Sequence, residues 1–269
     1  MDLALKENDY YVLGGAVLLV VLGGILGHLM GWTHSTENTL RFFTGGAILL
    51  GLVGLYRNIP HLEGVFARNM EIIGLGTATF LVSWLPHIGW HLQQRPDMLG
   101  FNTGFWAGLF HSWNAVSFLI ISYGIYLFHK SLNTDVGDFE KGFLNMHLKE
   151  KDYSFLLMAA LVVVIGGATG QITGFTEVLT LSTTYIQIPF ILAGLYYVYE
   201  LRTWGGEIGR NLQLIGVGLV LILLNWLPHI PWHIAGMPGI GISQGFWLGF
   251  FHSWVIAGFL VISYALHEL

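Results

Sequence analysis

Two histidine patterns recur in this chain, and imidazole is the commonest metal ligand in proteins. WLPHIGWH at 84–91 is repeated as WLPHIPWH at 226–233, and GFWAGLFHSW at 104–113 is repeated as GFWLGFFHSW at 245–254. The two histidines of each H-x-x-x-H segment are four residues apart, which places them on one face of a helix. A third histidine follows on the next apolar segment. The candidate ligands are therefore His87, His91, His111, His229, His233 and His252.

Two kinds of cofactor suit these histidines. One histidine from each of two helices can ligate a haem iron axially. His87 and His111 form the better axial pair, because helical rise places His91 about 6 Å nearer the water; His229 and His252 are their counterparts. Three imidazoles per set can instead bind copper or zinc directly. Tryptophans next to both sets would suit a haem, so haem b is the leading expectation and copper or zinc the alternative.

Two basic residues fall on the same side of the membrane as the histidines. Arg41 and Arg95 could pair with haem propionates at the first set of histidines, whereas the second set has no Lys or Arg on this side. The repeat alignment also places His28 opposite Gln171. A second haem site would therefore differ in kind from the first.

Glycines precede the third histidine of each set by seven and three residues. They are Gly104 and Gly108 before His111, with Gly245 and Gly249 in the repeat. Small residues let membrane helices approach closely, and they could equally make room for a flat macrocycle. Helix packing is the simpler interpretation.

The composition excludes whole classes of protein. Of 269 residues, 54% are apolar and 10% are charged, whereas a globular domain has roughly a quarter charged residues. This excludes a soluble enzyme and a disordered chain, and the net charge of -5 argues against a nucleic-acid partner. The absence of cysteine excludes disulfides, Cys-ligated iron–sulfur clusters and c-type haem attachment.

Runs of about 20 apolar residues predict an all-α integral membrane protein, because such a helix crosses a bilayer core of about 30 Å. The lipid bilayer is thus the first expected partner. Eight spans are predicted, at about 10–32, 38–56, 70–91, 102–128, 153–175, 181–200, 211–233 and 244–266.

The basic residues predict the orientation of these spans. Only Arg41 and Arg95 lie on the side opposite the N-terminus, and cytoplasmic loops are those enriched in Lys and Arg. We therefore expect a multi-pass cell-membrane protein with both termini cytoplasmic and the histidines toward the outside. The residues on the cytoplasmic side are Lys6, Arg57, Arg68, Lys130, Lys141, Lys149, Lys151, Arg202 and Arg210.

The recurring segments predict an internal duplication. Their offset stays between 140 and 143 residues, so each repeat holds four helices, and an even number of spans makes the two repeats parallel. The predicted domains are a first four-helix repeat at 1–130, a cytoplasmic linker at 131–150 and a second repeat at 151–269.

The leading functional expectation is a b-type cytochrome-like redox protein. One or two haems in the outer leaflet would transfer electrons, with quinol or a redox partner subunit as the candidate partner. Two alternatives stay open. One is a His-ligated copper or zinc protein that oxidises a substrate or handles metal, and the other is a structural or assembly subunit whose histidines only pack.

Overall fold

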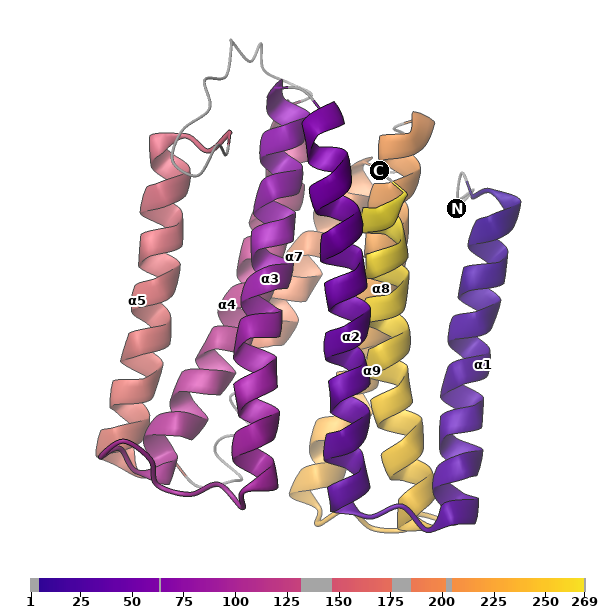
Figure 1. Cartoon of the computed structure of the whole chain (residues 1–269), viewed down its shortest axis with the longest axis vertical. Coiled ribbons are helices and arrows are strands. Elements are labelled where there is room, and N and C mark those ends of the chain that lie inside the picture. The colour runs from indigo at the N-terminus through magenta and orange to yellow at the C-terminus, as the bar shows by residue number, and fades with distance from the viewer. Residues whose placement is uncertain (1–4, 63, 132–146, 176–184, 202–204, 269) are drawn as a thin grey trace. The chain divides into compact units, whose positions relative to one another are not determined.

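The computed structural model describes residues 5–62, 64–131, 147–175, 185–201 and 205–268. The side chains at 34, 35, 37 and 38 lie outside this description. The described chain is helical (Figure 1). Its elements are α1 (Glu7–Met30), α2 (His34–Asn58), the 3-10 turn η1 (Ile59–His61), α3 (Gly64–Leu92), α4 (Thr103–Ser131), α5 (Glu150–Thr173), α7 (Gln187–Glu200), α8 (Gly206–Ile234) and α9 (Gln244–His267).

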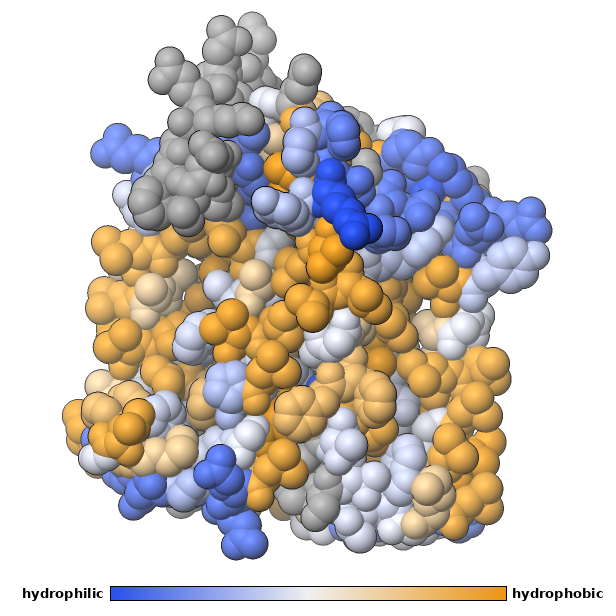
Figure 2. All heavy atoms as spheres, viewed as in Figure 1, coloured by the Kyte–Doolittle hydropathy of each residue, from blue (hydrophilic) through white to orange (hydrophobic). Residues whose placement is uncertain are grey.

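Within the described residues, seven helical segments are long and apolar enough to cross a membrane: α1, residues 39–61, α3, α4, α5, α8 and α9. Figure 2 shows apolar side chains along the middle of the helices and hydrophilic side chains at their ends. The prediction of an all-α chain with membrane-spanning helices is confirmed at this level. The predicted span at 181–200 lies partly outside the described residues, and its described part, α7, has 14 residues.

The apolar side chains of α1 and α5 are largely exposed. Leu18 is 57% exposed on α1, and Ile172 is 85% exposed on α5. In water such faces would be strongly unfavourable, because each buried methylene is worth about 0.8 kcal/mol. A lipid environment accounts for them, because apolar side chains in hydrocarbon need no protein cover.

The helices form two compact units. The first, here the terminal unit, comprises residues 1–54, 88–93 and 202–269, and the second, the central unit, comprises 55–87 and 94–201. In the terminal unit α9 packs against α1 and α8, and in the central unit α4 packs against α5 and α7. These units group helices that contact one another, whereas the predicted domains group helices by their repeated sequence motifs. The two divisions therefore do not test each other, and the internal duplication stays a prediction.

Glycines make the α1–α9 and α4–α5 contacts close. A Cβ atom added at Gly27 would meet the backbone carbonyl of Gly245, and one added at Gly170 would meet that of Gly104. Gly249 and Gly108 take part in the same two contacts. The glycines that precede His252 and His111 therefore serve helix packing, as their simpler interpretation predicts.

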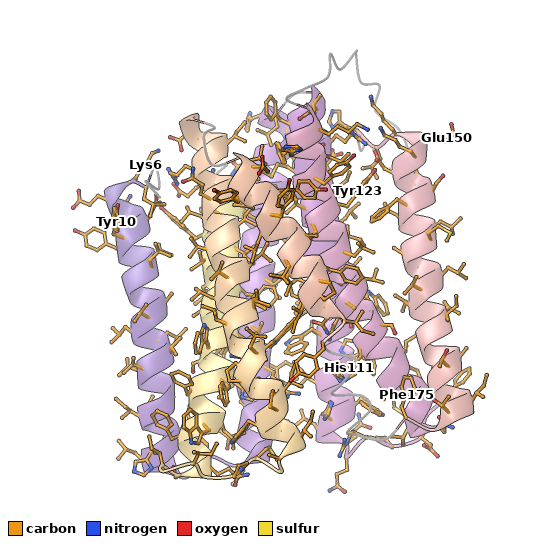
Figure 3. The ribbon with its side chains drawn as sticks, turned by 180° about the vertical axis from the view of Figure 1, so that it is seen from behind. Lys6, Tyr10, His111, Tyr123, Glu150 and Phe175 are labelled. Atoms are coloured by element: carbon orange, nitrogen blue, oxygen red, sulfur yellow. The ribbon has the colours of Figure 1, made fainter. Side chains whose placement is uncertain are left out.

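In the central unit, a buried ion pair lies at the end of the helices where α5 begins. The Arg68 guanidinium donates to both carboxylate oxygens of Asp152, with N–O distances of 2.6 and 2.5 Å. The Tyr123 hydroxyl donates to the same carboxylate at 3.0 Å, and the Lys149 backbone N–H donates at 2.8 Å. Asp152, the third residue of α5, thus accepts from the backbone of the N-cap residue Lys149 as in a capping box, and it joins α5 to α3 and α4. Figure 3 shows Tyr123 toward the end where Glu150 begins α5, and both His111 and Phe175 toward the opposite end.

The terminal unit has a corresponding cluster. Asp9 accepts from the Lys6 backbone N–H at 2.7 Å and from the Tyr264 hydroxyl at 3.0 Å. Arg210 lies 3.3 Å from the Asp9 carboxylate and also pairs with Glu207 at 2.9 Å and Glu268 at 3.5 Å. Helix α1 is thus held to α8 and α9, although almost the whole chain separates α1 from α9.

Candidate metal centre

Two helices of the terminal unit hold the second set of histidines. His229 and His233 lie near the end of α8, and His252 lies on α9. The side-chain amide of Asn225, one turn before His229, donates to the Phe251 carbonyl at 2.5 Å. This bond fixes α8 against α9 next to His252.

Hydrogen bonds also hold the loop between α8 and α9. The indole N–H of Trp232 donates to the Pro238 carbonyl at 2.8 Å. The Ser243 hydroxyl caps α9 by accepting from the Phe246 backbone N–H at 3.2 Å. Pro228 and Pro231 lie inside the last turns of α8, where each removes a helical N–H donor.

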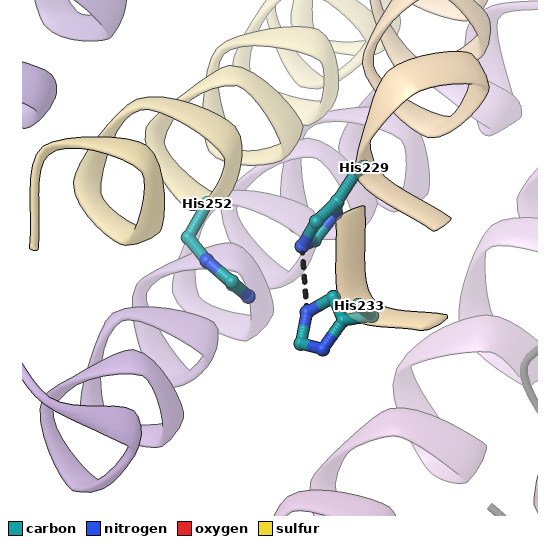
Figure 4. A group of neighbouring side chains, drawn as sticks. All are labelled: His229, His233 and His252. Carbon is teal, nitrogen blue, oxygen red and sulfur yellow. Dashed lines mark hydrogen bonds between the residues drawn. The ribbon is translucent and has the colours of Figure 1, made fainter. Parts of the chain in front are cut away.

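The three histidines converge on one point (Figure 4). The Nε2 atoms of His229 and His233 are 2.9 Å apart. One ring nitrogen from each of the three residues lies within 4.8 Å of the others. Two nitrogens at 2.9 Å can share an ion bound at about 2.0–2.1 Å if the angle at the metal is about 90°.

Hydrogen bonding sets the tautomer of His252. Its Nδ1 atom lies 2.8 Å from the Leu248 carbonyl oxygen. Because a carbonyl only accepts, Nδ1 carries the proton and donates, and Nε2 carries the lone pair. A metal-binding histidine usually donates its other N–H to such an acceptor. This contact orients the His252 ring as a metal ligand requires.

Aromatic side chains surround the centre. The His229 ring stacks on Phe251, with centroids 4.8 Å apart and planes at 17°. It meets the His252 ring edge to face, with centroids 4.9 Å apart and planes at 88°. His229 and His252 are buried, whereas His233 is half-buried, so an ion would have access from the His233 side.

The central unit brings His87 and His111 together in the same way. Their ring centroids are 5.1 Å apart with planes at 77°, and His87 stacks on Phe110 with centroids 5.0 Å apart. The Ser83 hydroxyl, four residues before His87, lies 2.8 Å from the Asn114 amide oxygen and 3.4 Å from the Phe110 carbonyl. The rings of His87 and His111 are thus neighbours, and their role as a pair of axial ligands stays a prediction.

His91 lies in the last turn of α3, in the part of that helix that belongs to the terminal unit. It is half-buried, and its ring centroid lies 5.3 Å from that of Trp90. Among the described residues, the group of three possible metal ligands is His229, His233 and His252. A three-ligand site that includes His91 stays a prediction.

The remaining predicted residues occupy other positions at the histidine ends of the helices. Arg41 is half-buried on α2, and Arg95 is half-buried in the loop that follows α3, at a φ of 57°. Their pairing with haem propionates stays a prediction.

His28 has a structural explanation. Its Nδ1 atom lies 2.8 Å from the hydroxyl of Ser243, the residue that caps α9. In the central unit Asn102 donates its backbone N–H to the Gln171 side chain at 3.0 Å and its side-chain amide to the Gln171 carbonyl at 3.1 Å. His28 thus joins α1 to the start of α9, and Gln171 joins α5 to the start of α4.

The imidazole separations bear on the choice of cofactor. A haem iron about 2 Å from two axial nitrogens would place the ring centroids roughly 6 Å apart, with the macrocycle between them. The His87–His111 and His229–His252 centroids are 5.1 and 4.9 Å apart. These closer, edge-to-face pairs suit a metal ion bound directly.

Sequence reasoning did not single out the buried ion pairs or Asn225. The echo of EKDY at 150–153 in ENDY at 7–10 was the available signal for Asp152 and Asp9. Asn225 could have been found as a polar residue four positions before His229 in an otherwise apolar run. Both features hold the helices that carry the histidines.

Comparison with protein-family models, with curated proteins and with solved structures finds no match to this chain.

Proposed function

We propose that this protein is an integral membrane protein that binds a transition metal ion, copper or zinc, through His229, His233 and His252. The convergence of one nitrogen from each ring within 4.8 Å carries the proposal. The second support is the Leu248 carbonyl, 2.8 Å from His252 Nδ1, which orients the lone pair of Nε2.

A centre with three protein ligands leaves one coordination position open. Structural zinc sites are normally closed by four protein ligands, whereas catalytic sites keep a position for water or substrate. A bound metal would supply Lewis-acid or redox chemistry there. The half-buried His233 would serve as the exchangeable ligand on the accessible side, and oxidation of a substrate or transfer of the metal to a partner are the functions that fit.

Haem-based electron transfer is the second candidate. It is supported by the repeated pairing of His87 with His111 and of His229 with His252, each beside aromatic rings. The short separation of the rings favours the metal ion. A haem would require each pair to open, with quinol or a partner subunit as the electron partner.

The proposed architecture is eight spans in two parallel four-helix repeats, with both termini cytoplasmic and the histidines toward the outside. Three observations support it. The motif offset of 140 to 143 residues fits four helices per repeat. Equivalent positions make equivalent contacts, as for Asp9 and Asp152. With eight spans, the basic residues other than Arg41 and Arg95 would all fall on one side of the membrane.

Metal content and the visible spectrum test the proposal directly. The full chain would be purified in detergent, reconstituted with copper or zinc, and measured for metal per folded chain. We expect His252→Ala to lose the bound metal, whereas His61→Ala, which alters an exposed histidine outside the centre, should retain it. His111→Ala tests whether the central unit holds a second cofactor.

The same measurements distinguish the rival functions. A Soret band in the oxidised and reduced spectra would favour haem over a bare metal ion. Full metal content in His252→Ala would refute the centre. No cofactor of any kind after reconstitution would favour a structural or assembly subunit, in which the histidines pack and bind nothing.

A further inference from the structure

The side-chain amide of Asn225 on α8 has only one of its two polar atoms paired. The residue is fully buried, and its Nδ2 atom donates to the Phe251 carbonyl at 2.5 Å. Its Oδ1 atom has no hydrogen-bond partner in the part of the chain that the structure describes. A buried acceptor without a donor is costly and uncommon in folded proteins. The packing of α8 on α9 therefore explains the amide nitrogen of Asn225 but not its oxygen.

Asn225 lies beside the metal centre. It precedes His229 by four residues, which places the two side chains on one face of α8 with Cβ atoms about 5–6 Å apart. Side chains in a helix point back toward the preceding turn, so the His229 ring is directed toward Asn225. The two residues also share a neighbour, because Asn225 donates to the Phe251 carbonyl and His229 stacks on the Phe251 ring.

Binding of a metal determines where the proton of His229 must lie. The Nε2 atoms of His229 and His233 are 2.9 Å apart (Figure 4), and in such a hydrogen bond one nitrogen carries a proton while the other accepts it. A metal ion bound by both rings needs both of these nitrogens without a proton. Each neutral imidazole then carries its proton on Nδ1. Because His229 is buried, its Nδ1–H needs an acceptor inside the protein.

We propose, on the basis of the metal site proposed above, that Asn225 is a positioning residue of this centre, whose Oδ1 atom accepts the Nδ1–H of metal-bound His229. Ligating histidines usually donate their second N–H to an oxygen acceptor, as His252 does to the Leu248 carbonyl at 2.8 Å. Asn225 gives His229 the same support. In the structure the His229–His233 hydrogen bond holds the His229 ring, and its replacement by two bonds to a metal allows the ring to turn toward Asn225.

The central unit differs at this level of its helices. Four residues before His87 stands Ser83, whose hydroxyl lies 2.8 Å from the Asn114 Oδ1 atom and 3.4 Å from the Phe110 carbonyl. The amide oxygen of Asn114 is thus already paired, whereas among the described residues that of Asn225 is not. The unpaired amide oxygen accompanies the group of three converging histidines, as a supporting role for the metal requires.

Two substitutions of Asn225 separate metal support from helix packing. Asn225→Leu removes both the donor and the acceptor, whereas Asn225→Asp keeps an oxygen acceptor for His229 and loses the donor to the Phe251 carbonyl. Zn(II) affinity would be measured on the full chain in detergent, against a chromogenic chelator. We expect Asn225→Leu to bind Zn(II) about 10–100-fold more weakly than the wild type. Asn225→Asp should bind it at least as tightly as the wild type, because carboxylates also support ligating histidines.

Asn211→Leu is the matched control for this comparison. It makes the same change on the same helix at an equally buried residue, roughly 27 Å from His229 by helical rise. Its Zn(II) affinity should equal that of the wild type. A role of Asn225 in packing alone predicts the opposite pattern, in which Asn225→Leu and Asn225→Asp weaken binding alike, and that result would overturn the proposal.

A second measurement follows the proton in the wild-type protein. With ¹⁵N-labelled histidine and asparagine side chains, nuclear magnetic resonance distinguishes an Nδ1–H from an Nε2–H imidazole. On addition of Zn(II) we expect a slowly exchanging Nδ1–H signal with a cross-peak to an asparagine side-chain amide, and this cross-peak should be missing in Asn225→Asp. A metal-loaded wild type without the cross-peak would refute the contact.

The outcomes separate this inference from the proposed function. Failure of the wild type to bind zinc or copper refutes both. If the wild type binds copper alone, the same measurements are made with Cu(I). Metal binding by the wild type with unchanged affinity in Asn225→Leu refutes the role of Asn225 and leaves the metal site in place. If Asn225→Leu does not fold, as judged by gel filtration and helical circular dichroism, the cross-peak in the wild type decides the question.

Discussion

The guanidinium group of Arg68 binds both carboxylate oxygens of Asp152, at 2.6 and 2.5 Å, across 84 residues of chain. Both side chains are buried. Burying an ion pair carries a large desolvation cost, which good geometry and additional hydrogen bonds offset. Asp152 has such bonds, from Tyr123 and from the Lys149 backbone, so it is the point where three helices of the central unit are joined.

Asp152→Asn should lower stability more than the equivalent change Asp9→Asn. The first leaves the buried Arg68 without its described counter-charge, a loss of about 3–5 kcal/mol for a broken buried pair. After Asp9→Asn, Arg210 retains Glu207 at 2.9 Å and Glu268 at 3.5 Å. The midpoint of thermal unfolding in detergent, followed by helical circular dichroism, compares the two. Glu150→Gln, at an exposed residue, is the control, and equal losses in the two Asp variants would contradict the prediction.

Gly27→Ala should destabilise the α1–α9 contact, whereas Gly14→Ala in the same helix should not. A Cβ atom at Gly27 would press on the Gly245 carbonyl, while one at Gly14 has nothing within 4 Å. Overpacking of this kind costs about 1–3 kcal/mol, and alanine at an open helical site is favoured by up to about 1 kcal/mol. Unfolding midpoints of the two variants should therefore shift in opposite directions. If the two midpoints shifted in the same direction by the same amount, α1 would not be packed as described.

Much of the fold could be predicted from the sequence because apolar runs of the right length have few other stable states. The pairing of His87 with His111 was also predictable, since a short loop brings consecutive helices together. In both cases the signal is local in the chain.

The contacts of α1 and α5 were not predictable in this way. Gly27 meets Gly245, and Gly104 meets Gly170, but no property of one glycine-rich helix says which other it contacts. The burial of Asp9 and Asp152 was missed for a related reason. A carboxylate in the first turn of an apolar helix looks solvent-exposed until its arginine, on another part of the chain, is placed.

Two co-expressed fragments, obtained by dividing the chain within residues 132–146, should associate with each other. The terminal unit takes α1 and α2 from the first fragment and α8 and α9 from the second, so its helices hold the fragments together through contacts such as Tyr264–Asp9. We expect the fragments to co-purify through a tag on either one. Because the α4–α5 contact of the central unit also joins the fragments, the matched control alters both contacts: Gly23→Leu and Gly27→Leu, together with Gly104→Leu and Gly108→Leu, on the first fragment should weaken recovery of the second. Independent migration of the unaltered fragments would contradict this organisation.

Single cysteines should label from opposite sides of the membrane at Asp97 and at Asp138. The natural chain has no cysteine, so each substitution gives a unique site. Asp97 lies in the loop at the start of α4, where its carboxylate accepts from the Thr103 backbone N–H at 2.6 Å. Asp138, outside the described residues, follows the other end of this 29-residue helix, which is about 43 Å long and can cross the bilayer.

In intact cells a membrane-impermeant maleimide should label Asp97→Cys, whereas Asp138→Cys should need permeabilised cells. Labelling in the reverse order would invert the proposed orientation, and labelling of both sites in intact cells would show that α4 does not span the membrane.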